Sequence, residues 1–227
     1  MQALIRPLNE LAEFEEIYKK RKDAPGMIRI SGCVNSQKTH MMYAMSDGCS
    51  YKVIACSSES KAKQVFEEYR MLSPETYLYP AKDLLFYQAD FRSKELVKQR
   101  MEVLQAVMTK EDVTVVTSFD AFMDALLPKE IIRERVIRIG SADVVDMEKL
   151  KRELVEIGYE REEQIEGPGQ FAVRGGIIDI YSLTEELPIR IELWGDEVDS
   201  IRTFDVDTQR SIENLDEIII NPATEFP

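Results

Sequence analysis

Hydrophobic residues at helical spacing alternate with short apolar runs along the first 130 residues of the chain. Leu11, Phe14 and Ile17, for example, share one face of a helix. The pattern predicts helices over 9–22, 38–45, 58–71, 93–108 and 119–127, and strands over 27–30, 51–56, 76–79 and 113–116. Because strands that alternate with helices form parallel sheets, we predict an α/β domain over residues 1–130.

The pattern changes after residue 130, where short strands separated by Gly, Pro, Asp and Asn predominate. One helix is predicted over 147–157, and strands over 136–139, 160–165, 170–173, 177–181, 189–194, 197–204 and 217–220. Successive strands joined by tight turns pair antiparallel. We therefore predict a small α+β domain with a mostly antiparallel sheet over residues 131–227.

Composition is that of an ordinary soluble protein, with 44% hydrophobic and 31% charged residues. No apolar run approaches the length of a membrane span and the first residues lack a signal peptide pattern, so we expect a cytoplasmic protein without membrane contact. Residues 141–227 hold 22 acidic and 8 basic residues. The negative electrostatic field of this segment repels a phosphate backbone and favours a protein partner over DNA. The alternative is that the acidic residues only keep the protein soluble.

Cys33, Cys49, Cys56 and His40 offer four candidate ligands for zinc, but their spacing fits no common zinc motif. We interpret the cysteines as small apolar residues in a reducing compartment and expect no metal site.

Residues 31–39 read S-G-C-V-N-S-Q-K-T between a predicted strand and a predicted helix. Gly32, Lys38 and Thr39 match the spacing of a phosphate-binding loop, but Gln37 occupies the position of its second glycine. A side chain there hinders the backbone from wrapping a phosphate, and no acidic residue directly ends strand 113–116 to hold Mg²⁺. We predict a non-functional nucleotide loop and no catalytic residue; residual nucleotide binding, or DNA binding by the first domain, is the alternative.

The stretch 166–181, E-G-P-G-Q-F-A-V-R-G-G-I-I-D-I-Y, places Arg174 before two glycines that interrupt a strand pattern. Paired glycines indicate a bulge, a tight turn or close approach of another backbone. The pattern is compatible with a simple hairpin that exposes an arginine.

Arg190, Glu192 and Trp194 alternate with three aliphatic residues, so a strand would place them on one face. Arginine and tryptophan dominate the energetics of protein interfaces because they combine bidentate pairing with large buried area. A surface pair between Arg190 and Glu192 beside a half-buried Trp194 is the alternative.

With both halves considered, the chain resembles the N-terminal region of the bacterial transcription-repair coupling factors, a degenerate copy of the excision-repair helicase subunit UvrB. The resemblance is carried by G-Y-E-R at 158–161, G-P-G-Q-F-A-V-R-G-G-I-I-D-I at 167–180 and P-I-R-I-E-L-W-G-D-E-V-D-S-I-R-T-F-D-V-D-T-Q-R-S at 188–211. Weaker matches are the nucleotide loop, Y-P-A-K-D at 79–83 and S-K-E-L-V-K-Q-R at 93–100.

The resemblance implies a RecA-like first domain without ATP hydrolysis, followed by a domain that binds UvrA in nucleotide excision repair. It assigns UvrA contacts to Arg174, Arg190 and Trp194, where the family more often has phenylalanine at the last position. It also implies that ATP and Mg²⁺ binding, DNA translocation and RNA polymerase binding belong to parts beyond residue 227, so that this chain itself needs no cofactor.

Overall fold

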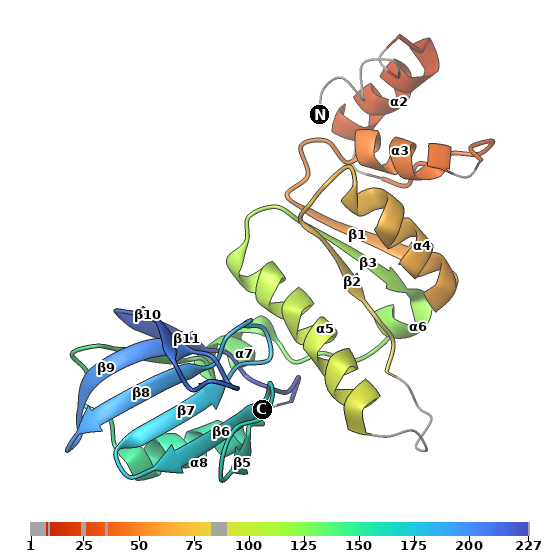
Figure 1. Ribbon diagram of the computed structural model, residues 1–227. Helices are drawn as coiled ribbons and strands as arrows, with labels where there is room; N and C mark the ends of the chain where they lie inside the picture. The colour runs from red at the N-terminus through yellow and green to blue at the C-terminus, as the bar shows by residue number, and fades with distance from the viewer. Residues whose placement is uncertain (1–7, 9, 24–25, 35, 83–89, 227) are drawn as a thin grey trace. The chain divides into compact units, whose positions relative to one another are not determined.

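The computed structural model describes residues 8, 10–23, 26–34, 36–82 and 90–226 (Figure 1). Contacts between residues divide the chain into two compact units. The first consists of Met1–Ala81 with Thr109–Met123, and the second of Lys82–Met108 with Asp124–Pro227. Each unit has its own sheet and its own core.

The first unit is α/β, with three parallel strands in the order β1-β3-β2. Its elements are α2 (Ala12–Asp23), α3 (Ser36–Met45), β1 (Tyr51–Cys56), α4 (Glu59–Arg70), β2 (Thr76–Tyr79), β3 (Val113–Ser118) and α6 (Phe119–Phe122). Ile54, Leu78 and Val116, one from each strand, pack against Ala62 and Val65 of α4. The predicted parallel sheet is confirmed, whereas its likeness to a RecA fold remains a prediction.

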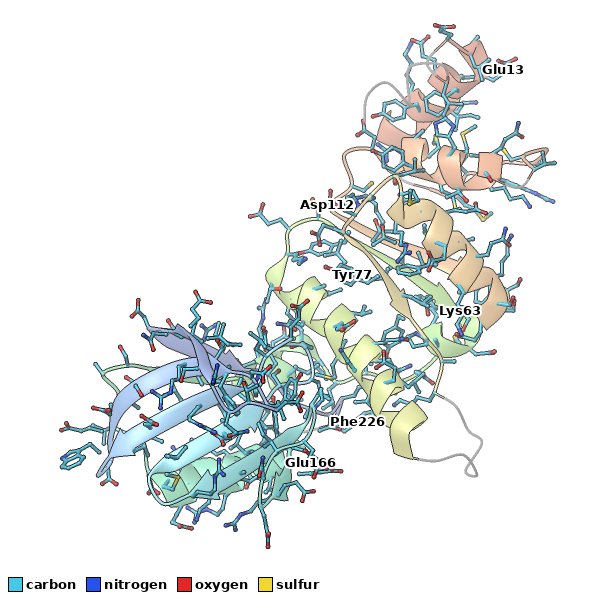
Figure 2. All side chains as sticks on the ribbon, in the orientation of Figure 1. Glu13, Lys63, Tyr77, Asp112, Glu166 and Phe226 are labelled. Carbon is cyan, nitrogen blue, oxygen red and sulfur yellow. The ribbon has the colours of Figure 1, made fainter. Side chains whose placement is uncertain are left out.

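Polar residues fix both ends of this sheet. At the carboxyl ends of the strands, the Glu59 carboxylate accepts hydrogen bonds from the Ser118 hydroxyl and from the Ala81 N–H. At the amino ends, Lys52 pairs with Asp112 at 2.5 Å, and Figure 2 labels Asp112 and Tyr77 in this region. Side-chain contacts thus link all three strands at their carboxyl ends, and β1 to the start of β3 at the amino ends.

The predicted strand over 27–30 is wrong. These residues form no strand, and Met27, Ile28 and Ile30 are exposed. A run of four residues forms a strand only beside a neighbour that completes its hydrogen bonds, and no described strand pairs with it. The predicted helix over 119–127 is also shorter than expected, because α6 ends at Phe122.

The second unit is α+β, and its sheet is mostly antiparallel as predicted. Six strands follow the order β10-β9-β8-β7-β6-β5, with only β5 and β6 parallel, and β11 pairs separately with β4. The elements are α5 (Asp90–Thr109), α7 (Lys129–Glu134), β4 (Ile137–Gly140), α8 (Met147–Glu156), β5 (Glu160–Glu162), β6 (Gln170–Arg174), β7 (Ile177–Tyr181), β8 (Ile189–Trp194), β9 (Glu197–Phe204), β10 (Ser211–Asn214) and β11 (Glu217–Ile220). The sequence pattern did not predict α7 or β10.

The core of the second unit lies between α8 and one face of the six-stranded sheet (Figure 1). Leu150 and Leu154 of α8 pack with Ile178 and Ile191 of the central strands. Asp146 caps α8, because its carboxylate accepts a hydrogen bond from the Lys149 N–H. The opposite face of the sheet carries charged side chains beside a smaller apolar cluster that includes Ala172 and Phe204.

Helix α5 belongs to the second unit by its contacts, so the compact units differ here from contiguous domains 1–130 and 131–227. The Arg100 side chain is completely buried and pairs with Glu225 through two nitrogen atoms and with Asp124 at 3.0 Å. Met101 enters the core described above. A buried arginine needs such carboxylates because an uncompensated charge is costly to remove from water.

Glu225 titrates under opposing influences. Burial alone would raise the pKa of its carboxyl group, but hydrogen bonding and charge from Arg100 and Lys82 hold the pKa below its ordinary value of 4.5. The folded state therefore binds this proton less readily than the unfolded state, so the group stabilises the fold above pH 4.5. The stabilisation is lost as the pH falls through the lowered pKa.

Glu225→Gln should lower the free energy of unfolding by about 3–5 kcal/mol at pH 7, because it strips a buried arginine of its main counter-charge. The difference between variant and parent should shrink as the pH falls below 4.5. Urea denaturation from pH 3 to 7 measures both effects. Glu217→Gln, which breaks an exposed pair with Arg138, is the control and should cost under about 1 kcal/mol. A constant difference between variant and parent across this range would contradict the assignment.

Candidate partner-binding face

The glycines after Arg174 form a two-residue turn between β6 and β7, in which Arg174 lies opposite Ile177. Gly175 has a φ of 61°, which glycine adopts at no steric cost. A Cβ on Gly176 would lie 2.8 Å from the carbonyl oxygen of Leu193, which belongs to the adjacent strand β8. Of the alternatives that the paired glycines indicated, the structure shows a tight turn and the close approach of another backbone.

A second two-residue turn joins β8 to β9, with Trp194 opposite Glu197. Gly195 provides its positive φ of 67°. The two turns lie at the same end of the sheet, because the Leu193 N–H donates to the carbonyl oxygen of Gly176 at 2.8 Å. Arg174 and Trp194 are thus the last residues of β6 and β8, at the turns of two neighbouring hairpins.

All three predicted contact residues lie on one face of the sheet, opposite α8, which we call the polar face. Val173, Ile191 and Leu193 point into the main core. Since side chains alternate along a strand, their neighbours Arg174, Arg190 and Trp194 point to the other side. The predicted common face of Arg190, Glu192 and Trp194 is consistent with this arrangement.

Residues of the polar face line up in rows that cross the strands from β6 to β9. One row consists of Arg174, Ile177, Glu192 and Ser200, and the next of Ala172, Asp179, Arg190 and Arg202. Hydrogen bonds link the two rows diagonally, from Arg174 to Asp179 and from Arg202 to Glu192. The face is therefore a network of paired charges.

Asp179 is the centre of this network and is only 2% exposed. Its Oδ1 accepts a hydrogen bond from Arg190 Nε at 2.6 Å. Its Oδ2 accepts from Arg190 Nη2 and from Arg174 Nη2, each at 2.8 Å. A carboxylate removed from water requires such charge-assisted hydrogen bonds, so both arginines are structural partners of Asp179.

Arg190 is the more firmly held of the two arginines. Its Nη2 also donates to Gln209 Oε1 at 2.7 Å, and its guanidinium lies 4.2 Å from the centre of the Phe204 ring. Hydrogen bonding to Asp179 raises the pKa of Arg190 above its already high value. Gln209 adopts a φ of 58°, unusual for a residue with a side chain, and thereby presents its amide to Arg190.

The three predicted contact residues differ in how far their side chains are exposed to solvent. The side chain of Arg190 is 12% exposed, that of Arg174 is 46% exposed, and Trp194 is 83% exposed. Arg174 and Trp194 can therefore meet a partner directly, whereas Arg190 holds Asp179 in place. The alternative of a surface pair between Arg190 and Glu192 is wrong, since Glu192 pairs with Arg202.

Asp179 and Gln209 were missed by the sequence analysis. A signal for Asp179 existed, because a carboxylate inside the apolar run I-I-D-I is a candidate for burial and, once buried, needs a positive partner. Gln209 gave no comparable signal, since its role depends on a turn between β9 and β10 that brings it to Arg190.

Two residues of the predicted nucleotide loop, Thr39 and Gln37, have hydrogen-bond partners in the first unit. Thr39 is buried, and its hydroxyl donates to Glu68 of α4 at 2.7 Å. The Gln37 side chain accepts a hydrogen bond from the Val34 N–H at 3.3 Å. Gly32 and Lys38 are exposed. The hydroxyl that would hold Mg²⁺ in a working loop is thus engaged by a carboxylate.

Across the described ranges, no three His, Cys, Asp or Glu side chains gather where they could hold a metal ion. Within those same ranges, no helix combines the length and apolar character needed to cross a bilayer.

Comparison with known proteins places these features in a family context. Residues 137–226 match the UvrB interaction domain family. The transcription-repair-coupling factor of Bacillus subtilis strain 168 is 43% identical over 149 residues, which are 66% of this chain and 13% of that protein. Those of Staphylococcus haemolyticus and Staphylococcus epidermidis are 36% and 35% identical over 152 residues, 67% of this chain and 13% of each relative. The chain thus spans about an eighth of the length of these relatives.

Replacement of each arginine by alanine should separate their structural roles. Arg190→Ala should cost about 3–5 kcal/mol of unfolding free energy, because a buried carboxylate loses its main partner. Arg174→Ala should cost under about 1 kcal/mol, because Arg190 still binds both oxygens of Asp179 and the Arg174 side chain is about half exposed. Urea denaturation measures both, with Arg138→Ala, another exposed arginine of the second unit, as the reference. Equal losses for Arg174 and Arg190 would refute this division.

Proposed function

The chain is a relative of the bacterial transcription-repair-coupling factors and carries a UvrB interaction domain, and from this premise we propose that it binds UvrA through the polar face of its second unit. The observation that carries the proposal is the placement of Arg174 and Trp194, both exposed, on one face at one end of the sheet. Their side chains combine a guanidinium able to bind a carboxylate with a large apolar ring.

The proposal assigns different tasks to the three predicted contact residues. Trp194 buries its ring against the partner, and Arg174 turns from Asp179 toward a partner carboxylate. This exchange leaves Asp179 paired, because Arg190 already binds both of its oxygens. Arg190 therefore acts as a positioning residue that keeps the face intact while Arg174 is used in binding.

In the whole protein, this contact would recruit UvrA to sites of stalled transcription. RNA polymerase binding and ATP-driven movement on duplex DNA are assigned, in this proposal, to parts of the protein outside this chain. The chain itself contributes the docking surface for excision repair and carries out no reaction.

We further propose that the loop around Lys38 neither binds nor hydrolyses ATP. Three features support this: Gln37 in place of a glycine, the hydrogen bond from Thr39 to Glu68, and the lack of a strand over 27–30 that would position the loop.

Trp194→Ala and Arg174→Ala should each weaken binding of purified UvrA by roughly tenfold to a thousandfold, the range of interface hot spots. Isothermal titration calorimetry measures the affinity, and circular dichroism confirms that the variants remain folded. Ile212→Ala and Arg138→Ala, exposed residues of the same unit away from the polar face rows, are the matched controls and should bind like the parent. Parent-like affinity of both test variants would rule out the polar face as the UvrA site.

Titration of the chain with Mg-ATP should give no binding heat, and phosphate release should not exceed the buffer background. Lys38→Ala should leave both results unchanged, because the loop lacks the backbone geometry that would place this lysine on a phosphate. Binding heat that disappears in Lys38→Ala would instead establish a residual nucleotide site.

A further inference from the structure

Three residues form a last row at the turn end of the polar face, which we call the end row: Trp194, Glu197 and Val144. Trp194 lies opposite Glu197 at the turn between β8 and β9. Val144, from the segment between β4 and α8, forms a single antiparallel bridge with Glu197 on its other side. Glu197 is therefore flanked by one apolar side chain on each side.

Hydrogen bonds around the bridge fix the direction of these side chains. The Val145 N–H donates to Asp196 O at 2.7 Å, and the Val198 N–H donates to Asp143 O at 3.0 Å. These bonds surround a pair whose own side chains stand directly opposite each other, in the close arrangement of antiparallel strands. Val145 and Val198 enter the core, so Val144 and Glu197 point to the polar face with Trp194.

The end row combines apolar exposure with an unpaired charge. Trp194 is 83% exposed and Val144 is 73% exposed. The other acidic groups of the polar face rows are neutralised, Asp179 by two arginines and Glu192 by Arg202. By contrast, no hydrogen bond or ion pair joins the Glu197 carboxylate to any described part of the chain.

We infer that the end row receives a basic side chain of the protein partner, an arginine or a lysine. The aliphatic stem of such a side chain would pack between Val144 and Trp194. Its cationic group would lie at the Trp194 ring and form an ion pair with the Glu197 carboxylate. The excess of 22 acidic over 8 basic residues in 141–227 attracts the same charge. This inference rests on the proposed function, because it describes a second contact of the same face.

The two contacts set a spacing for the partner. Arg174 and Glu197 lie three strands and two residues apart, which corresponds to about 16 Å between their Cα atoms. The partner should therefore present an acidic group for Arg174 and a basic group for Glu197 at a comparable separation. Opposite charges at fixed positions define the orientation of docking and disfavour a reversed approach.

Charge reversal at Glu197 tests the inference. Glu197→Lys should weaken UvrA binding at least about tenfold, since the new lysine would repel the basic side chain of the partner. Glu197→Gln should lower the affinity less and reduce its dependence on salt, because one ion pair is removed without repulsion. Glu213→Lys makes the same charge change on exposed strand β10, at the far end of β9, and should bind like the parent.

Substitution of Val144 tests the apolar part of the proposed contact independently of the charge. Val144→Ala should weaken binding several-fold, and its effect should be smaller in a Trp194→Ala background, because both residues contact one side chain. Val155→Ala is the matched control, since Val155 is an exposed valine on α8, across the sheet. Urea midpoints equal to that of the parent exclude a loss of folding.

The outcomes distinguish the two proposals. Failure of the parent chain to bind UvrA would overturn the proposed function and this inference together. Binding that Trp194→Ala weakens, but that Glu197→Lys affects no more than Glu213→Lys does, would overturn only the inference about a basic side chain. Weakening by Glu197→Lys without any effect of Val144→Ala or of salt would also overturn it, because neither packing nor charge pairing would then explain the contact.

Discussion

The buried carboxylate of Asp179 is the constraint that organises the polar face. It lies on a central strand, 2% exposed, where water cannot solvate its charge. Neighbouring strands must therefore supply positive charge, and the register places Arg190 beside it and Arg174 one row away. The ring of Phe204 and the amide of Gln209 then hold Arg190 in the orientation that Asp179 needs. Residues that look like a binding motif are first of all parts of a structural network.

This network explains how one face can be both rigid and available for binding. Arg190 binds both oxygens of Asp179, so the contact of Arg174 is an addition that can be exchanged without leaving a buried charge unpaired. Trp194 lies beyond the network, at the turn, where its ring has no structural duty in the core. The centre of the face, around Asp179, is thus fixed, whereas the side chains at its turn end are free to adapt to a partner. Only these few side chains would have to become ordered on binding.

Local patterns revealed most of the fold of the second unit, because its strands alternate and its turns contain glycine at the positions that need it. Gly175 and Gly176 are predictable as a turn, whereas the approach of Leu193 to Gly176 depends on a third strand. The strand expected over 27–30 failed because a strand requires a neighbour, which no local pattern reports. At the site, the common face of Arg190, Glu192 and Trp194 followed from alternation. The place of Arg174 on that face depended on the pairing of β6 with β7, and the unequal exposure of the arginines depended on Asp179 and Gln209.

The pairing of Arg100 with Glu225 joins residues that are 125 positions apart. During synthesis at about 5–20 residues per second, the carboxylate would follow the guanidinium by roughly 6–25 s. The segments of the first unit are complete by Met123, about 100 residues before Glu225. Until Glu225 has been synthesised, the Arg100 side chain lacks the main carboxylate that compensates its burial. The second unit can therefore bury Arg100 against Glu225 only after almost the whole of this sequence has been synthesised.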